Sequence, residues 1–266
     1  MGILTAGGFP PVNSYKKETM NDFHRFFLEY MGADEKALHS GERVFHSAVR
    51  TSPETPFDFN RHHLIVAEYN GMLIHSIARE LISGYISSAP QQTSDKLLEQ
   101  VDDAFFSVNR GRYYRIREMF RYTVNHGYEE EPQVTILTPE HREMIFATSG
   151  RRGADVQEWL WQKNVLPLVK EGRRISVIRD GKIVASSNVI DLPFAAANID
   201  VWTHRDHRRK GYGSMCVKQA VNWCIKNDRI PVYLVHTTNE RSVNLADSLG
   251  FQRMSREIQT VITRFR

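Results

Sequence analysis

The chain has 266 residues, of which 41% are apolar and 25% are charged, and its formal net charge is +4. A chain of this length buries one large core or two small ones, so length alone does not fix the number of domains. No apolar run approaches the ~20 residues that a membrane-spanning helix needs, and we therefore expect no membrane partner. The basic residues are scattered and no nucleic-acid-binding motif occurs, so we expect no nucleic-acid partner either.

The cysteines and the first residues indicate a cellular location. Cys216 and Cys224 lie eight residues apart on one predicted helix, and a helix rises about 12 Å over that length, so the two cannot form a disulfide with each other. Residues 1–4 lack the basic flank of a signal peptide, and Ala6 stands where the myristoylation pattern needs Ser or Thr. We expect a reducing, cytoplasmic location. The histidines lack the spacing to Cys or Glu partners that metal sites show, so we expect no metal.

The first half of the chain is predicted to be a smaller α/β domain. Segments 21–30 and 93–108 are predicted helices, and segments 64–69 and 72–77 are predicted strands joined by Asn70-Gly71, a pair typical of a two-residue hairpin turn. Residues 129–132, Glu-Glu-Glu-Pro, form a polar stretch that breaks regular structure. We therefore expect an N-terminal domain over 1–131 and a second domain over 132–266.

The second half is predicted to form a mixed sheet flanked by helices. The pattern indicates a strand, two helices, three strands, a basic turn, a helix, a strand, a helix and a final strand. The predicted strands are 134–137, 175–179, 182–190, 199–203, 231–236 and 257–264, and the basic turn is 208–214. The predicted helices are one that starts at Pro139, then 155–169, then one with an apolar stripe at Val217, Ala220, Val221 and Cys224, and finally 239–249. Asp180-Gly181 predicts a second hairpin turn, and Gly250 predicts a left-handed helix end.

The basic turn Arg208-Arg209-Lys210-Gly211-Tyr212-Gly213-Ser214 lies between a predicted strand and a predicted helix. Free N–H groups, the positive end of a helix dipole and cationic side chains together favour a phosphate or a pyrophosphate. A Walker loop needs its lysine after the second glycine, and a dinucleotide fingerprint needs a third glycine where Cys216 stands. Both of these phosphate motifs are therefore excluded.

Two motifs together resemble the GNAT superfamily of N-acetyltransferases. The first is Arg208-x-x-Gly211-x-Gly213, and the second is Asn239-x-x-Ser242-x-x-Leu245 followed by Leu249-Gly250-Phe251. The resemblance covers about half the chain, from roughly residue 132 to the end, and it implies a GNAT fold there. Val201-Trp202-Thr203, with the segment from Asn239 to Ala246, further resembles the zwittermicin A resistance branch, which also carries an extra N-terminal region.

The two predicted hairpins have the same form, so the N-terminal domain is either a degenerate GNAT-like copy or merely contains a similar turn. It lacks Arg-x-x-Gly-x-Gly. We therefore expect no second coenzyme site in it, and we expect it to shape the acceptor pocket.

The resemblance implies acetyl-CoA as the acyl donor, with the pyrophosphate of coenzyme A held by the basic turn chiefly through main-chain N–H groups. The strand before the turn would pair with the pantetheine arm, and Asn239 would steady that arm from the other side. The expected cofactor-binding residues are Val201, Trp202, Thr203, Arg208, Arg209, Lys210, Gly211, Tyr212, Gly213, Ser214 and Asn239. Solvated side chains at Arg209 and Lys210 remain an alternative.

The implied reaction is direct attack of a free amine on the thioester, without an acyl-enzyme. Many family members place an acidic tyrosine one position after the motif's leucine, where this chain has Ala246, so Ser242, a water or the solvent would protonate the thiolate. The candidate bases are Asp200, a carboxylate within an apolar strand, and His236, at the end of the next strand. Alternatively, Asp200 is paired with an arginine and His236 is exposed or forms a cap.

The sequence therefore supports two functions. The first is an N-acetyltransferase that acts on a small-molecule amine, such as an amine-bearing antibiotic in self-protection. The second is a GNAT-fold protein that binds coenzyme A as a sensor or interaction module without turnover. The sequence leaves the oligomeric state open.

Overall fold

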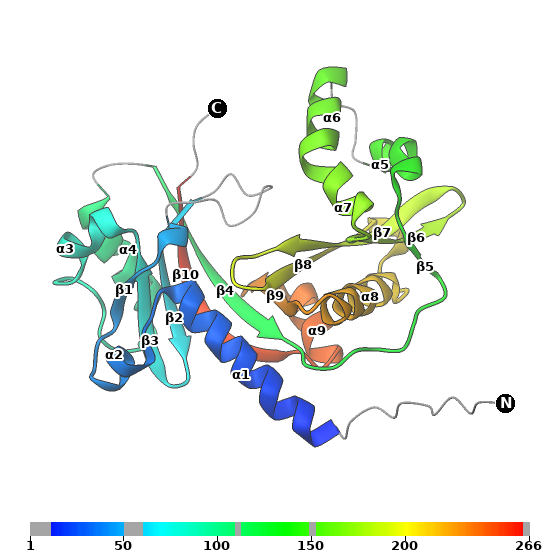
Figure 1. Ribbon diagram of the computed structural model, residues 1–266. Helices are drawn as coiled ribbons and strands as arrows, with labels where there is room; N and C mark the ends of the chain where they lie inside the picture. Colours follow the sequence, from blue (N-terminus) through cyan, green and yellow to red (C-terminus); the bar gives the residue numbers. More distant parts are fainter. Residues whose placement is uncertain (1–11, 51–60, 110–112, 149–152, 263–266) are drawn as a thin grey trace.

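A computed structural model of the protein describes residues 12–50, 61–109, 113–148 and 153–262, and they form one ten-stranded sheet with helices on both faces (Figure 1). The sheet is mixed, because most neighbouring strands are antiparallel and two pairs are parallel. The predicted α/β class, with a central mixed sheet flanked by helices, is confirmed.

The first half contributes four strands. In chain order its elements are α1 (Val12–Met31), α2 (Glu35–His39), β1 (Val44–His46), β2 (Arg61–Tyr69), β3 (Met72–Ile77), α3 (Ile82–Tyr85), α4 (Leu97–Val108) and β4 (Arg115–Thr123). Asn70 and Gly71 both have positive φ, 48° and 74°, as a two-residue hairpin turn of the predicted type requires.

The second half follows the predicted order of elements. They are β5 (Val134–Ile136), α5 (Arg142–Thr148), α6 (Ala154–Leu160), α7 (Leu166–Lys170), β6 (Arg174–Arg179), β7 (Lys182–Asp191), β8 (Ala196–Thr203), α8 (Tyr212–Lys226), β9 (Ile230–His236), α9 (Glu240–Ser248) and β10 (Gln252–Ile262). The helix predicted over 155–169 is broken by a π-helical turn, Trp161–Val165. The last strand starts at Gln252, earlier than predicted, and its predicted end at Arg264 lies outside the described residues.

Strands from the two halves alternate in the middle of the sheet. The strand order is β1-β3-β2-β10-β4-β9-β8-β7-β6-β5. β10 pairs with β2 on one side and with β4 on the other, and β4 in turn pairs with β9. The sheet is therefore continuous across residue 131. The division into domains 1–131 and 132–266, and the origin of the first as a degenerate copy, stay predictions.

Helix α8 covers one face of the sheet beside the basic turn. Its apolar stripe contains Cys216, Val217, Ala220, Val221 and Cys224, which all have exposed fractions of 1% or less. The stripe packs against inward-facing residues of β6 to β9. Burial raises the pKa of the Cys216 thiol to about 12, and both Cys216 and Cys224 are buried thiols of the core.

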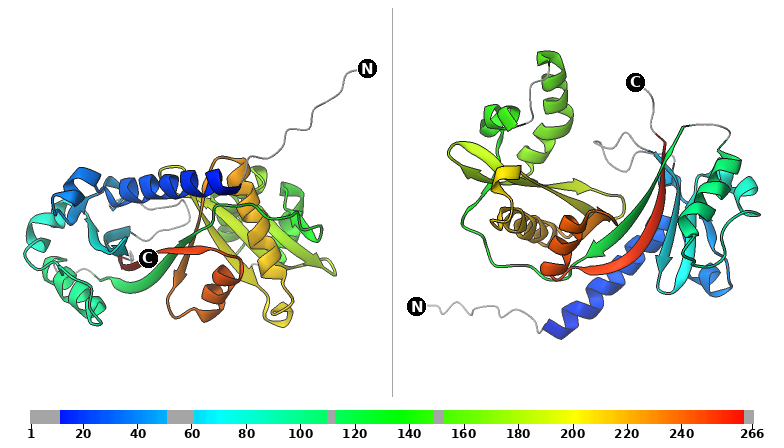
Figure 2. Two further views of the ribbon diagram at one scale, coloured as in Figure 1. Left: turned by 90° about the horizontal axis from the view of Figure 1, so that it is seen from below. Right: turned by 180° about the vertical axis from the view of Figure 1, so that it is seen from behind.

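Helix α1 lies on the face of the sheet opposite α8, over the strands of the first half, and it contacts both β3 and β9 (Figure 2). Beneath it, the side chain of Arg121 on β4 is paired with that of Glu257 on β10, with 2.6 Å between Nε and Oε1. Both side chains are at most 1% exposed, and the guanidinium of Arg121 stacks over the ring of Tyr30 from α1. This ion pair ties the strand supplied by the first half to the last strand of the second.

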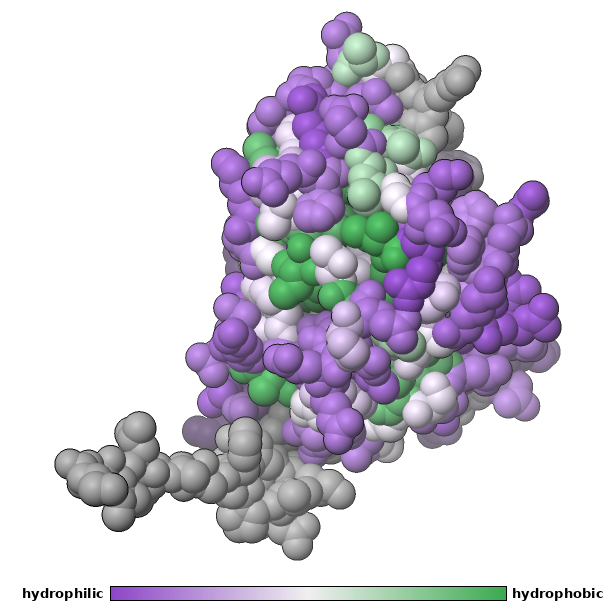
Figure 3. All heavy atoms as spheres, turned by 90° about the vertical axis from the view of Figure 1, so that its right-hand side faces the viewer, coloured by the Kyte–Doolittle hydropathy of each residue, from purple (hydrophilic) through white to green (hydrophobic). Residues whose placement is uncertain are grey.

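The surface on the side of α5 and the β6–β7 hairpin is mostly hydrophilic, with a central group of apolar side chains (Figure 3). No helix among the described residues is long and apolar enough to cross a membrane. The described residues also contain no group of three or more His, Cys, Asp or Glu residues that could hold a metal ion.

Candidate functional site

Neighbouring strands β8 and β9 separate toward their C-terminal ends. Their parallel pairing runs from Ala196 opposite Ile230 to Asn198 opposite Val232. Both strands then continue, β8 to Thr203 and β9 to His236. The side-chain amide of Asn198 accepts a hydrogen bond from the N–H of Leu234, at 3.3 Å, where a main-chain partner would otherwise lie. The separation opens the sheet at the edge that leads into the basic turn.

The basic turn has the backbone shape of an anion-binding loop. Arg209 and Gly211 both have positive φ, 61° and 78°, so the chain alternates between left-handed and ordinary conformations and its N–H groups converge. Gly211 is the N-cap of α8 and has no side-chain cap. The first-turn N–H groups of this helix are consequently free to bind a ligand at the positive end of the helix dipole.

Gly213 sets how closely α8 approaches β8. A Cβ atom at this position would lie 2.9 Å from Oγ1 of Thr203 and 3.5 Å from Cγ2 of Val201. Only glycine leaves room for this approach, and the approach brings the first turn of α8 against the diverging end of β8. The glycines of the motif therefore have separate structural roles.

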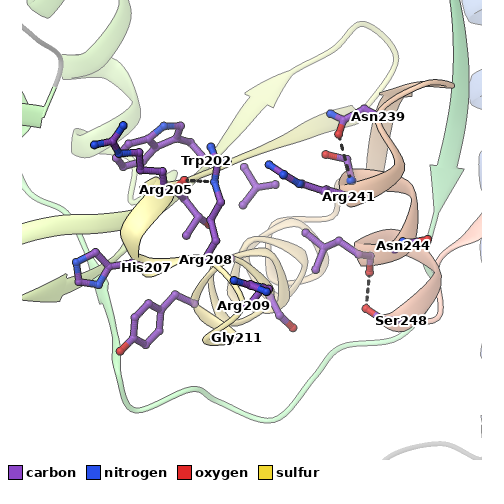
Figure 4. A pocket seen from close by; sticks show the side chains of 17 residues that line it. Trp202, Arg205, His207, Arg208, Arg209, Gly211, Asn239, Arg241, Asn244 and Ser248 are labelled. Atoms are coloured by element: carbon purple, nitrogen blue, oxygen red, sulfur yellow. Dashed lines mark hydrogen bonds between the residues drawn. The ribbon is translucent and has the colours of Figure 1, made fainter.

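A hollow of about 1090 Å³ joins the basic turn, the end of β8 and one side of α9 (Figure 4). The residues that line it are Val201, Trp202, Thr203, Arg205, His207, Arg208, Arg209, Gly211, Tyr212, Gly213, Ser214, Asn239, Arg241, Ser242, Asn244, Leu245 and Ser248. Four arginines and no carboxylate belong to this described lining, so the hollow is electropositive. In this respect it suits a large anionic ligand.

The hollow brings together every predicted cofactor-binding residue except Lys210. Arg208 also braces the turn, because its Nε donates to the carbonyl of Thr203 at 3.2 Å. Asn239 caps α9 and accepts from the N–H of Ser242 through its side chain. The role of each of these residues in binding stays a prediction.

Several residues of the wall lie outside the sequence motifs. Arg205 and His207 precede the basic turn, and Arg241, Asn244 and Ser248 belong to α9. The last three recur every three or four residues and share one face of the helix with Leu245. This helical period is a sequence signal that could have identified them once Asn239 was placed on the same wall.

Asp200 does not line the hollow; its side chain lies beside β7. Its carboxylate accepts hydrogen bonds from the main-chain N–H of Asn188, at 2.9 Å, and from its side-chain amide, at 2.8 Å. Burial raises the pKa of Asp200, while the bonds from Asn188 and the charge of Arg174 act in the opposite direction. Asp200 is thus a half-buried carboxylate with an elevated proton affinity at the diverging edge of β8.

The other two candidate catalytic residues differ in position. His236 is half-buried and does not line the hollow, and its Nδ1 lies 2.8 Å from the hydroxyl of Thr238 within the turn after β9. Ser242 does line the hollow. Its main-chain N–H donates to the carbonyl of Asn239 at 3.0 Å, which fixes the first turn of α9.

Comparison with known proteins gives the following relationships. No curated protein matches the sequence. A family profile described as GNAT acetyltransferase matches residues 85–257. This span includes β8, α8 and α9 and starts well before the expected domain boundary.

Solved structures of similar fold include GNAT proteins of low sequence identity. A putative acetyltransferase from the GNAT family of Novosphingobium aromaticivorans is 15% identical, with a TM-score of 0.45 over 58% of this chain and 69% of that chain. A GNAT-family acetyltransferase from Colwellia psychrerythraea is 12% identical, with a TM-score of 0.48 over 73% and 78%. A tandem GNAT protein from the clavulanic acid biosynthesis pathway is 13% identical, with a TM-score of 0.45 over 67% and 62%. At these values the structural likenesses carry no argument about function.

The family match therefore rests on the profile, which covers well over half of the residues and contains the whole wall of the hollow. The chain belongs to the GNAT acetyltransferase family, whose members generally use acetyl-CoA.

Proposed function

We propose that this protein transfers the acetyl group of acetyl-CoA directly to a primary amine of a small molecule. The observation that carries the proposal is one continuous hollow that connects the uncapped start of α8 with the end of β8 that no longer pairs with β9. A long donor with an anionic end and a reactive end needs both features in one continuous space.

The residues present fit coenzyme A. The free N–H groups at the start of α8 and the side chains of Arg208 and Arg209 would bind the pyrophosphate. The main chain of Val201 and Thr203 lies on the wall where β8 no longer pairs with β9, and it would bind the pantetheine amides as an added strand. Asn239 would contact the arm from the opposite wall.

Acetyl-CoA supplies an acetyl thioester, which a neutral amine can attack. The chain's own residues would orient that attack and move protons. The N–H near Trp202 would donate to the thioester oxygen, Asp200 would accept a proton from the ammonium group of the acceptor, and Ser242 would face the sulfur. His236 is the alternative base.

The acceptor is proposed to be an amine-bearing antibiotic, with acetylation protecting the producing cell. This part rests on the sequence resemblance to zwittermicin A resistance acetyltransferases, carried by Val201-Trp202-Thr203 and by the segment from Asn239 to Ala246. We also propose that the first half of the chain shapes the acceptor pocket and that the protein acts in the cytoplasm.

Two measurements on the purified chain test the proposal. Calorimetric titration with coenzyme A should show binding, and thiol release from acetyl-CoA should appear with at least one member of a panel of amines, aminoglycosides and peptide antibiotics included. Mass spectrometry of the product should find one added acetyl group on nitrogen. A chain that shows no binding at millimolar coenzyme A contradicts the proposal.

A coenzyme A-binding sensor without turnover is the second candidate. The observation that favours it is Ala246, which is 1% exposed and carries no ionisable group where many family members have their acid. Binding of coenzyme A without thiol release on any amine would establish the sensor over the enzyme.

A further inference from the structure

Three polar residues lie in one line across adjacent strands of the sheet. Arg174 on β6 is directly opposite Asn188 on β7, and Asn188 is directly opposite Asp200 on β8. Directly opposite residues of antiparallel strands project from the same face of a sheet, with Cβ atoms about 5 Å apart. All three residues are half-buried, so solvent reaches each of them. Together they form the polar row, a surface roughly 10 Å long across three strands.

The polar row lies on the face of the sheet opposite α8. Ile175 and Val201 alternate with it on the same strands and pack into the core beneath α8. On the face of the polar row, Ile183 belongs to the core that contains residues of α5 and α7, and Ala196 belongs to the core beneath α1 (Figure 1). The polar row therefore separates two apolar cores on this face.

The Asp200 end of the polar row adjoins the hollow. Trp202 follows Asp200 by two residues on β8, so the two side chains share a face of the sheet. Trp202 is 42% exposed and lines the hollow. The Arg174 end lies two strands away, on β6. A molecule bound along the polar row would therefore present the group held by Asp200 to the hollow and extend the rest of its length toward β6.

The polar row has hydrogen-bonding capacity of both kinds that the chain does not use. Asn188 donates to the carboxylate of Asp200 through its side-chain nitrogen, at 2.8 Å, but its own Oδ1 is buried without a partner among the described residues. The Nε atom of Arg174 is likewise buried and unpartnered, and no carboxylate in the described part of the chain forms an ion pair with this guanidinium. Buried polar atoms that stay unpaired destabilise a protein, so a ligand that pairs with them is favoured.

The neighbouring row on the same face is internally satisfied. Ser176 is directly opposite Ser186, and its hydroxyl donates to that of Ser186 at 2.9 Å. Both residues are at most 5% exposed. The polar row differs from this pair because its guanidinium and one of its amide oxygens lack such a partner and because solvent reaches it.

We propose that the polar row binds the acceptor as a zwitterion: Arg174 binds a carboxylate of the acceptor, and Asn188 and Asp200 bind its ammonium group. The proposal rests on the proposed function and deepens it, because it assigns the acceptor to amines that also carry a carboxylate, as amino acids and peptides do. A guanidinium binds a carboxylate through two parallel, charge-assisted hydrogen bonds. The Oδ1 atom of Asn188 and the carboxylate of Asp200 accept the N–H groups of the ammonium.

The charges at the two ends of the polar row favour one orientation of such an acceptor. Burial lowers the pKa of Arg174, and the negative charge of Asp200 raises it. Burial raises the pKa of Asp200, and the bonds from Asn188 and the charge of Arg174 lower it. The two charges therefore act on each other across Asn188. A zwitterion complements both of them only when its nitrogen lies at the Asp200 end, beside the hollow.

The first test compares matched acceptors on the wild-type protein. The panel consists of amino acids and dipeptides, their C-terminal amides and the corresponding amines without a carboxylate, each assayed by thiol release from acetyl-CoA. For the best acceptor, the acid should exceed its amide and its carboxylate-free amine by on the order of 100-fold in kcat/KM, because both lack the partner of Arg174. If carboxylate-free amines react as well as the acids, the proposal is overturned and the proposed function stands.

The second test removes the guanidinium. Arg174→Gln should lower kcat/KM for the acid on the order of 100-fold, mainly through KM, and leave the amide nearly unchanged. Arg174→Lys keeps the charge without the fork and should retain part of the preference for the acid. Lys182→Gln is the control, because it removes one positive charge from an exposed position of the β6–β7 hairpin, and it should match the wild type. Equal losses for acid and amide would make Arg174 a structural residue and overturn the proposal.

A binding measurement separates this inference from the proposed function. Calorimetric titration of the same panel into protein saturated with coenzyme A should show binding of the acid and at least tenfold weaker binding of its amide, and Arg174→Gln should abolish the difference. Binding of the acid without thiol release from acetyl-CoA supports the zwitterion site and refutes the proposed transfer. If no amino acid or dipeptide binds at millimolar concentration, the inference is wrong, whichever amine the protein acetylates.

Discussion

Gly213 on α8 faces Thr203 on β8 so closely that a Cβ atom on the glycine would lie 2.9 Å from the Thr203 hydroxyl. The absence of a Cβ atom at Gly213 therefore determines how closely the start of the helix can approach the end of the strand. The basic turn and the end of β8 that no longer pairs with β9 meet at this contact.

Gly213→Ala should push α8 away from β8. We expect the free energy of unfolding to fall by about 1 to 3 kcal/mol, as for other overpacked sites, and the affinity for coenzyme A to fall at least tenfold. Calorimetry and urea denaturation measure the two effects. The control is Gly153→Ala, at a position with an ordinary φ and nothing within 4 Å of the added atom. If removal of the Thr203 hydroxyl in the background of Gly213→Ala restores nothing, the steric explanation is wrong.

Arg209 and Lys210 allow the effect of net charge on coenzyme A binding to be separated from the effect of direct contact with the ligand. They are adjacent and both exposed, yet only Arg209 lines the hollow. We expect Arg209→Gln to weaken coenzyme A binding about tenfold, or ~1.4 kcal/mol, and Lys210→Gln to weaken it far less. Titration at two salt concentrations measures both. Equal losses would mean that the turn acts only through its net charge.

Asp200 should show opposite effects on activity and on stability. Its raised pKa means that the base form is lost as pH falls through a value above the ordinary one for aspartate. Asp200→Asn should lower kcat/KM on the order of 100-fold and remove the acid limb of the pH profile. Because burial disfavours the charge, the same variant should unfold at the wild-type temperature or above it. If Asp200→Asn keeps the acid limb of the pH profile, another group is the base, and His236 is the next candidate.

The ion pair between Arg121 and Glu257 should govern stability at low pH. Burial alone would raise the pKa of Glu257, but the charge of Arg121 and hydrogen bonds from Arg121, Ser255 and Gln259 lower it below the ordinary value. A lowered pKa in the folded state contributes stability above the pKa of the unfolded state, ~4.3 for Glu, and that contribution is lost as pH falls through the folded value. Denaturation curves of the wild type should therefore lose stability below about pH 4.

Glu257→Gln supplies the comparison for that pH series. It leaves the Arg121 guanidinium buried without its counter-charge, so we expect a loss of about 3 to 5 kcal/mol at neutral pH. The variant should also lack much of the acid-dependent loss of the wild type. A variant that keeps the wild-type slope below pH 4 would assign the acid sensitivity to other carboxylates.

Local chemistry explains which parts of this fold the sequence could predict. The turns at Asn70-Gly71 and Asp180-Gly181, the left-handed end at Gly250 and the stripe of α8 depend on a few neighbouring residues, and the structure confirms them. The place of β4 between β9 and β10 depends on partners more than a hundred residues away. No local pattern encodes such pairing.

The residues of the candidate site also differ in how well the sequence could predict their positions. The basic turn and Asn239 belong to contiguous motifs, and the structure brings them to one hollow. Asp200 is part of an apolar strand, and nothing in its neighbours indicates that Asn188 on β7 binds its carboxylate. That contact depends on how β7 and β8 pair, which only the tertiary structure determines.

The position of β4 has a consequence for how the protein is made. A ribosome releases this strand long before either of its neighbours, because β9 and β10 come from the last part of the described chain. Both hydrogen-bonding edges of β4 must then stay unpaired while more than a hundred further residues are synthesised, and unpaired edges invite aggregation. We expect ribosome-bound chains stalled before β10 to be protease-sensitive at β2 and β4, because both strands pair with β10 and the sheet becomes continuous only when this last strand emerges.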